Sequence, residues 1–217
     1  MKFIFLLALY FSIPSLAQNY DAKDIPAGGP YPWESEGLRA HKMWDLHVQL
    51  FGVGPAYDLS ESITLGYFLD RNNLIQVEVG EGNNLGRGIG DDLFDFTKVR
   101  SSSVGINFKH FVSNSFYFVV GLSEIRTKYQ YDDGITSDNA SFTTNSLHAT
   151  IDIGNEWQWE DLNLGCDWIG SSLKLNSTVT DENPPTTSGF FANYSDDRSR
   201  YTSSFTTALR FYIGASF

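Results

Sequence analysis

The sequence predicts an all-β protein, an eight-stranded antiparallel up-and-down transmembrane β-barrel. Three observations predict this fold class. Apolar residues alternate with polar or small ones along separate stretches of the chain, and a period of two is that of a strand. Several stretches run past ten residues, as tilted membrane strands must. The connections between them are alternately short and long, which is typical of barrels whose two ends face different compartments.

The first four strands follow from this alternation. Their apolar sets are Leu46, Val48 and Leu50; Ile63, Leu65, Tyr67 and Leu69; Ile75, Val77 and Val79; and Val104, Ile106 and Phe108. The stretch "DRNN" has turn-forming residues and separates the second strand from the third. The fourth strand is predicted over residues 98–111, which is longer than the strands of most soluble sheets.

The last four strands are predicted in the same way, over 116–130, around 142–157, around 162–168 and over 200–217. Two more short turns follow: "VSNS" joins the fourth strand to the fifth, and "WQWED" joins the sixth to the seventh. The other connections are long, polar and acidic, and we expect loops at residues 82–97, 131–141 and 176–199. A secreted β-sandwich has no reason to make alternate connections long, so the pattern favours the barrel.

Composition is compatible with this choice. The chain has 217 residues, a formal net charge of −11, 15% aromatic residues and a mean hydropathy of −0.23. A polar lumen and polar loops hide the apolar belt of a membrane barrel from any such average. The acidic charge argues against nucleic acid as a partner. The single cysteine, Cys166, excludes an intramolecular disulfide.

The N-terminal residues predict export. Residues 1–17 combine Lys2, an apolar run over 3–13 and a small residue at Ala17, which is the pattern of a cleaved signal peptide. The run is shorter than the roughly 20 apolar residues of a membrane helix. Residues 18–43 contain Pro26, Pro30 and Pro32 and are expected to form an irregular periplasmic extension with at most a short helical turn. The barrel is predicted over residues 44–217.

The C-terminal strand carries a family resemblance. Its alternating apolar set is Leu209, Phe211, Ile213, Ala215 and Phe217. Such a strand with a terminal Phe resembles the assembly signal of bacterial outer-membrane proteins. Together with the signal peptide and the eight strands, the chain resembles a small barrel of the OmpA/OmpX type from a Gram-negative bacterium. The resemblance implies an outer-membrane monomer in contact with lipid and lipopolysaccharide, inserted by the outer-membrane assembly machinery.

The predicted lumen is polar. An eight-stranded barrel is just wide enough for its side chains to fill, and buried charges need partners. We therefore expect an ionic network in which Arg210 and Lys109 pair with some of Glu78, Asp152 and Asp167. Other inward candidates are His47, Gln49, Asn107, His148 and Asn163. The facing of Glu124, Arg126 and Lys128 stays open, and Glu156 is expected to be solvated near the periplasmic rim.

Aromatic residues are expected in two girdles at the membrane surfaces. The predicted periplasmic girdle is Trp44, Tyr67, Phe111, Trp157, Trp159 and Phe217. The predicted outer girdle is Phe94, Phe96, Tyr129, Tyr131 and Tyr201.

Three functions follow from these predictions. The favoured one is a structural or surface-interaction role, with a filled lumen and acidic loops that meet an unknown partner. The first alternative is a narrow pore for small solutes. The second is a lipid-modifying enzyme. We expect no enzyme activity, cofactor or metal site, and the carboxylates of "YDDGITSDN" and "SDDRSR" are expected to be solvated loop charges.

Two groups of residues bear on the enzyme alternative. His110 and Ser113 are three positions apart, so a strand would separate their side chains. His148 shares one face with Ser146 and Asp152, but such a set is common in a polar lumen.

Overall fold

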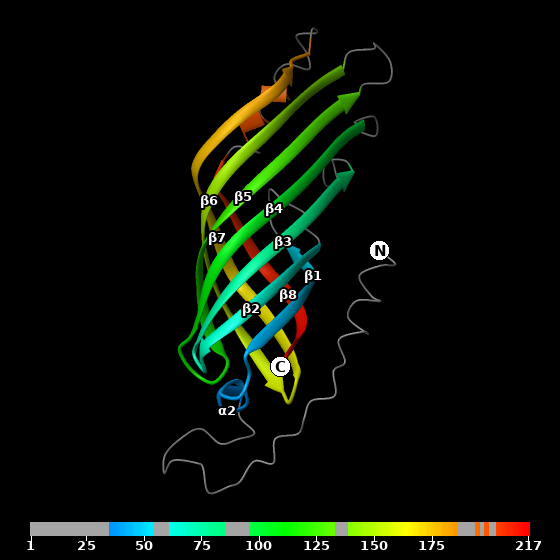
Figure 1. Cartoon of the computed structure of the whole chain (residues 1–217). Coiled ribbons are helices and arrows are strands. Elements are labelled where there is room, and N and C mark those ends of the chain that lie inside the picture. The colour runs from blue at the N-terminus through cyan, green and yellow to red at the C-terminus, as the bar shows by residue number, and fades with distance from the viewer. Residues whose placement is uncertain are drawn as a thin grey trace, which may run out of the picture.

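Alternating residues of a strand lie on opposite faces of its sheet, and in this protein one sheet closes on itself. The computed structural model is a barrel of antiparallel strands (Figure 1). It describes residues 35–53, 61–85, 96–132, 139–185, 194–195, 198–199 and 203–217. The strands are β1 (Trp44–Val53), β2 (Glu61–Asp70), β3 (Asn73–Leu85), β4 (Phe96–Phe111), β5 (Phe116–Asp132), β6 (Asn139–Trp159), β7 (Leu162–Asn183) and β8 (Phe205–Ser216). The helix α2 (Ser35–Arg39) precedes them.

Each strand pairs with the next in the chain, and β8 pairs with β1. In that last ladder Val48 lies opposite Ile213. The ladder reaches the end of the chain, because Trp44 and Phe217 exchange two backbone hydrogen bonds of 2.8 and 2.9 Å. In hydrocarbon every backbone N–H and C=O must be paired, and a closed sheet achieves this. The predicted eight-stranded up-and-down barrel is confirmed. Within the described residues, no helix has the length and apolarity to cross a membrane.

The outward face carries an apolar belt. On β4, for example, Val104 and Ile106 are 50% and 61% exposed, whereas Asn107 and Lys109, which follow them, are buried. Exposed outward residues of the other strands include Leu65, Val77, Val120, Leu122, Ile151, Ile153, Leu173, Leu209 and Ile213. Trp168 also faces outward and is 43% exposed. A ring of exposed aliphatic side chains around a closed barrel is the surface that lipid covers.

The wall of the barrel is uneven in height. β1 and β2 have 10 residues each, whereas β6 has 21 and β7 has 22. The β4–β7 side therefore extends well past the rest, at the end opposite the short turns (Figure 1). We call this extension of β4–β7, which on β5 begins at Glu124, the outer wall. The two ends of the barrel are called the short-turn end and the long-loop end.

The outer wall has its own apolar core, on its inner side. Ring centroids of Tyr129 and Phe142 lie 4.7 Å apart in a stack, and Tyr194 meets Phe142 edge-on at 5.5 Å. This outer core consists of Val99, Ile125, Tyr129, Ala140, Phe142 and Tyr194, with Val179 packed against it.

The strands extend into all three predicted loops. β3 continues to Leu85, β4 begins at Phe96, β6 begins at Asn139 and β7 continues to Asn183, so the predicted bounds 82–97, 131–141 and 176–199 are wrong. The reason is that the outward face of the outer wall is polar, which ends the apolar alternation while the hydrogen-bonded ladder continues. The three short turns lie where they were predicted.

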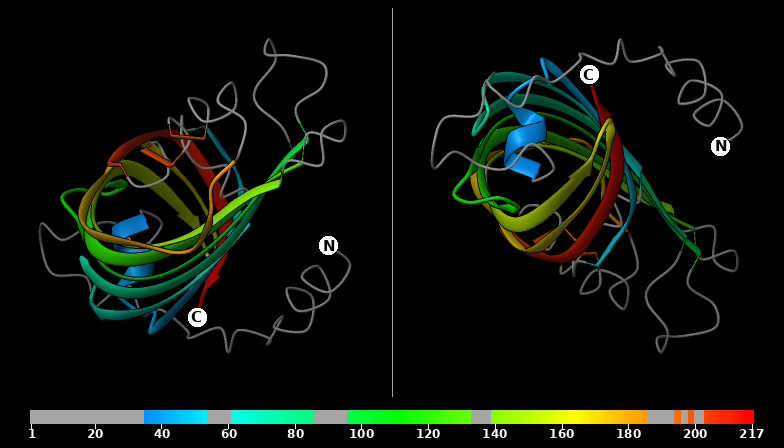
Figure 2. Two further views of the ribbon diagram at one scale, coloured as in Figure 1. Left: turned by 90° about the horizontal axis from the view of Figure 1, so that it is seen from above. Right: turned by 90° about the horizontal axis from the view of Figure 1, so that it is seen from below.

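The helix α2 lies inside the ring of strands at the short-turn end, where it covers the opening (Figure 2). It falls within the extension predicted to be irregular, and it is the short helical turn that was allowed there. Residues 1–17, predicted to be a signal peptide, and residues 18–34 lie outside the described residues.

The aromatic girdles are partly as predicted. Trp44, Tyr67, Trp157, Trp159 and Phe217 are all exposed near the short-turn end. Two assignments are wrong, because Phe111 is 1% exposed and Tyr129 is 2% exposed. Both side chains point into the barrel. Phe111 lies against Arg39 of α2, and Tyr129 lies in the outer core. Phe94 and Tyr201 lie outside the described residues, and the side chains of Phe96 and Tyr131 are not described.

Candidate functional site: the filled lumen

A central ionic cluster crosses the middle of the lumen. Arg210 on β8 places Nε 2.6 Å from Oδ2 of Asp167, its neighbour on β7, and Nη1 3.0 Å from Oε1 of Glu78 on β3. A third carboxylate, Asp152 on β6, lies 3.8 Å from Nη2. A guanidinium presents its donors in a rigid planar fork, so this one side chain ties three carboxylates from three other strands.

Two tyrosines connect this cluster to a second one. The hydroxyl of Tyr117 donates to Asp167. The hydroxyl of Tyr212 lies 3.0 Å from that of Tyr117 and 2.9 Å from Oε2 of Glu156. Because Tyr212 has one hydroxyl proton, it can donate to only one of these two oxygens at a time.

Lys109 lies at the centre of the second cluster. Its Nζ is 2.5 Å from Oε2 of Glu156 and 2.8 Å from the hydroxyl of Tyr212. The same ammonium lies 3.8 Å from the centroid of the Tyr117 ring. Lys109 and Glu156 are 2% and 0% exposed, and a buried pair needs such extra partners to offset its loss of hydration.

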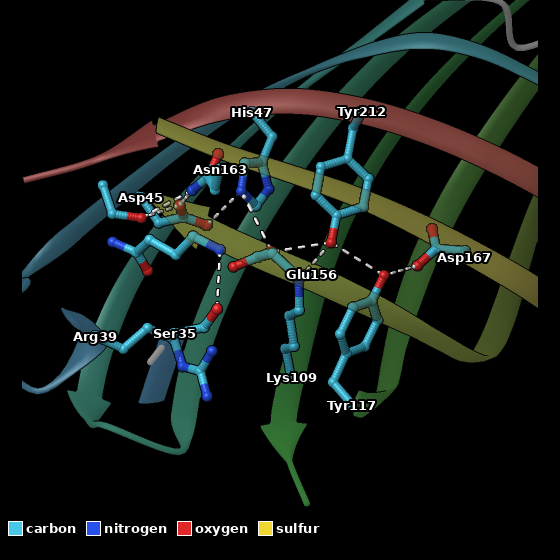
Figure 3. Close-up of polar contacts among 12 residues, drawn as sticks. Ser35, Arg39, Asp45, His47, Lys109, Tyr117, Glu156, Asn163, Asp167 and Tyr212 are labelled. Carbon is cyan, nitrogen blue, oxygen red and sulfur yellow. Dashed lines mark hydrogen bonds and ion pairs between the residues drawn. The ribbon is translucent and has the colours of Figure 1, made fainter. Parts of the chain in front are cut away.

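The cluster ends at the short-turn end with Asp45 and His47 of β1. Nε2 of His47 is 3.0 Å from Oδ2 of Asp45 and 3.6 Å from Oε2 of Glu156. Oδ1 of Asp45 accepts hydrogen bonds from Nδ2 of Asn163 at 2.7 Å and from the hydroxyl of Ser216 at 2.8 Å. Figure 3 shows this chain of contacts from Asp45 through Glu156 and the tyrosines to Asp167.

The helix α2 closes the lumen below these residues. Arg39 of α2 is fully buried, donates from Nη1 to the carbonyl of Asn114 at 2.8 Å and lies 3.6 Å above the Phe111 ring. Burial lowers the pKa of Arg39 to about 10, partly offset by the negative charge of Glu156. This guanidinium therefore stays charged at neutral pH. Ser35 accepts the backbone N–H of Gln158 at 3.0 Å and fixes the helix against β6.

A small polar cavity remains between the two clusters and the β1–β4 wall. It measures about 30 Å³, which is room for one or two water molecules. Its lining includes His47, Gln49, Gln76, Asn107 and Arg210.

The predicted network residues are placed as follows. Glu78, Asp152 and Asp167 surround Arg210, whereas Lys109 pairs with Glu156 instead. The expectation that Glu156 is solvated is wrong, because α2 covers that end of the lumen. The other inward candidates are all buried, while Glu124, Arg126 and Lys128 are exposed on the outward face.

Sequence reasoning missed several members of the network. Asp45 is two residues before His47, and Glu156 is four residues after Asp152, so strand parity alone places both inward. Tyr117 could not be assigned because its strand has apolar residues on both faces. No sequence pattern predicted the role of Arg39, because this residue reaches the lumen from a helix outside the sheet.

The residues weighed for catalysis are separated or enclosed. His110 is on the outward face beside Asn73, 2.7 Å from its Oδ1. His148 and Ser146 share the inward face of β6 and are 0% and 2% exposed. The barrel wall encloses both, whereas a lipid-modifying site needs a side that is open to its substrate.

Comparison with known proteins identifies the fold. No family model matches the chain, and no curated protein matches it. Among solved structures, a major outer-membrane protein of Thermus thermophilus is similar over 82% of this chain and 100% of its own, with 12% identity and a TM-score of 0.54. Ail, the attachment invasion locus protein of Yersinia pestis, has 9% identity over 81% of this chain and 97% of its own, with a TM-score of 0.47. The N-terminal barrel domain of Pseudomonas aeruginosa OprF has 10% identity over 81% of this chain and 98% of its own, with a TM-score of 0.45.

The chain thus has the fold of the small eight-stranded barrels of bacterial outer membranes. The apolar belt agrees with this fold, because an exposed ring of aliphatic side chains is stable only in contact with lipid.

Proposed function

We propose that this chain is an outer-membrane barrel with a structural and surface-interaction role, and that it does not conduct solutes. The observation that carries this proposal is the ionic network that crosses the lumen. Arg210, Lys109 and the residues around them connect opposite walls through charge-assisted contacts of 2.5–3.0 Å. Such a network braces the barrel against deformation and occupies the path that a solute would need.

Planar-bilayer recordings of the refolded, full-length mature chain test the plug. The proposal predicts a silent bilayer, without discrete conductance steps. The narrow-pore alternative predicts steps of constant size that scale with salt concentration, and steady steps of that kind would overturn the plug. A second recording with Arg210→Ala serves as the positive comparison, because loss of the central cation should permit leakage.

The outer wall supports the interaction part of the proposal. Beyond the belt, β5 presents Glu124, Arg126, Lys128 and Gln130 outward, a mixed-charge surface on the tallest part of the molecule. Barrels of this fold place their short turns in the periplasm and their longer loops outside the cell. In that orientation the outer wall rises from the cell surface and can meet a polar partner.

Protease treatment of intact cells tests this orientation. Cleavage within residues 124–145 from the outside, with the short-turn end protected, is the predicted result. Cleavage of the outer wall only after the outer membrane has been permeabilised would contradict it.

A further inference from the structure

The short-turn end of the lumen gathers three side chains that are common metal ligands. Asp45 and His47 come from β1 and Glu156 from β6, and one potential ligand atom of each lies within 4.8 Å of the other two. Their exposures are 0%, 4% and 0%. They are thus not a surface cluster of solvated acids, and burial of this kind requires a compensating partner.

Each of the three side chains has an atom that no hydrogen bond uses. In Asp45, Oδ1 accepts from Asn163 and Ser216, while Oδ2 has no hydrogen bond. In Glu156, Oε2 accepts hydrogen bonds from Lys109 and Tyr212, while Oε1 has no hydrogen bond. Nε2 of His47 also has none. A buried polar atom without a partner has lost its hydration without compensation, so three together call for an occupant.

The distances fit a shared ion better than direct hydrogen bonds. Oδ2 of Asp45 and Nε2 of His47 are 3.0 Å apart, yet they make no hydrogen bond of acceptable direction. Two ligand atoms at that separation, each about 2.1 Å from one metal ion, would subtend about 90° at the ion. A nitrogen lone pair aimed at such an ion points about 45° away from the neighbouring oxygen, which is a poor direction for a hydrogen bond.

The contacts around the cluster resemble those that hold metal ligands in place. Asn163 and Ser216 orient the Asp45 carboxylate, and Lys109 and Tyr212 orient that of Glu156. Outer contacts of this type fix the direction of the free ligand atom. The 30 Å³ cavity, which His47 also lines, offers space for a water molecule as a further ligand.

A proton on His47 is the competing occupant. With neutral His47, the charges of Asp45, Glu156 and Lys109 sum to −1; a proton would bring this sum to 0 and a divalent cation would bring it to +1. Arg39 of α2 adds a positive charge nearby, but it directs its hydrogen bonds to backbone carbonyls. Oδ2 of Asp45 and Oε2 of Glu156 lie 3.0 and 3.6 Å from Nε2, but neither makes a well-directed hydrogen bond with it. The geometry therefore favours the ion.

We propose that Asp45, His47 and Glu156 bind one divalent transition-metal ion, with Zn²⁺ the best match to one imidazole and two carboxylates. The ion joins β1 to β6 directly above α2. It thereby fastens the strand that closes the barrel to the opposite wall.

The test uses untagged, full-length mature protein, refolded in detergent after chelator treatment, with Co²⁺ or Zn²⁺ present during refolding or added later. Calorimetry should give one Zn²⁺ per chain, and Co²⁺ should produce visible absorption of a low-symmetry site. The affinity should fall as the pH is lowered, because protons compete for the imidazole.

His47→Gln and Glu156→Gln should each weaken binding more than tenfold, whereas His110→Gln, an outward histidine, should retain it. Heat-modifiable migration on gels verifies that each variant is folded. Absence of stoichiometric binding by the parent protein would overturn the proposal even if a variant failed to fold. Binding of equal strength by folded His47→Gln would also overturn it, since the ion would then lie elsewhere.

Discussion

The two halves of the barrel use opposite chemistry on the same strands. In the half near the short turns, β5 exposes Phe116, Val120 and Leu122 outward, and the lumen beside it is ionic. Past Leu122 the outward residues of β5 become Glu124, Arg126 and Lys128. On the inner side of this second half, Ile125 and Tyr129 join an aromatic core.

The difference shows that the surroundings decide which face of a strand is apolar. Where lipid surrounds the sheet, apolar residues face outward and charges are paired inside. Where water surrounds it, the apolar residues move inside, as in any soluble β protein. The lumen of the first half is not purely polar, because Phe68, Leu74 and Phe111 form an apolar floor under the ionic clusters.

Loss of the Arg210 guanidinium should have the largest effect on the stability of the half of the barrel near the short turns. Arg210→Ala leaves the buried Asp167 and the half-buried Glu78 without their partner, and this should cost about 3–5 kcal/mol of unfolding free energy. Urea unfolding followed by heat-modifiable migration measures the loss. The matched control is Arg126→Ala, an exposed arginine of the outer wall, which should change stability by less than about 0.5 kcal/mol. Equal effects of the two variants would show that the lumen network is not a stabilising plug.

The outer core should respond locally rather than globally. Phe142→Ala removes the ring stacked on Tyr129 and should cost the outer wall about 3 kcal/mol. Hydrogen exchange should accelerate in the outer parts of β5 and β6, while amides around Val48 and Ile213 stay protected. Faster exchange throughout the barrel would mean that the two halves unfold as one unit.

A positive charge introduced on the outward face should cost more stability in the lipid-facing belt than in the outer wall. Ile106→Arg puts a guanidinium into the lipid-facing belt and should cost about 2 kcal/mol in bilayers. Ser102→Arg lies on the same face of β4, four residues nearer the long-loop end, and should have little effect. The pair is compared by folding into liposomes across a urea series, and equal costs would place the membrane boundary elsewhere.

The smallest expected effect is in a short turn. Asp70 accepts hydrogen bonds from the Asn73 side chain at 2.6 Å and the Asn72 backbone at 2.7 Å, and these two contacts lower its pKa. A carboxyl whose pKa is lowered by folding stabilises the protein at pH values above its unfolded pKa of about 3.9. This contribution is lost as the pH falls through the lowered pKa of the folded state. Asp70→Asn should reduce stability slightly at pH 7 and not at pH 2. A pH-independent difference in unfolding midpoints would exclude this role.

The fold was accessible from the sequence because lipid imposes a strict pattern. Alternation at Leu46 to Leu50 and at Leu209 to Phe217 predicted the strands that close the barrel. The far ends of the outer wall escaped prediction, most of all β7 beyond Trp168, because water on the outward face removes the requirement for apolar residues there. Residues such as Asn176 and Thr178 carry no apolar alternation, although they lie in the ladder of β7.

The candidate site was predicted only in part. Strand parity placed Glu78, Asp167 and Arg210 on the inward face, but parity says nothing of height along the barrel. Height depends on strand tilt and register, and these set Lys109 beside Glu156 rather than beside Asp167. The cover formed by α2 and Arg39 depends on a contact 75 residues apart in sequence, which no local pattern reveals.

Single-cysteine labels along the outward face of β5 test the central claim most directly. Cys166 is the only cysteine, so Cys166→Ala gives the background for spin labels at positions 116, 118, 120, 122, 124, 126, 128 and 130 in liposomes. We predict high accessibility to oxygen through position 122 and a sharp change to high accessibility to a water-soluble nickel chelate from position 124. Uniform exposure to the nickel chelate, or lipid contact continuing to position 130, would contradict the claim that lipid and water divide this face.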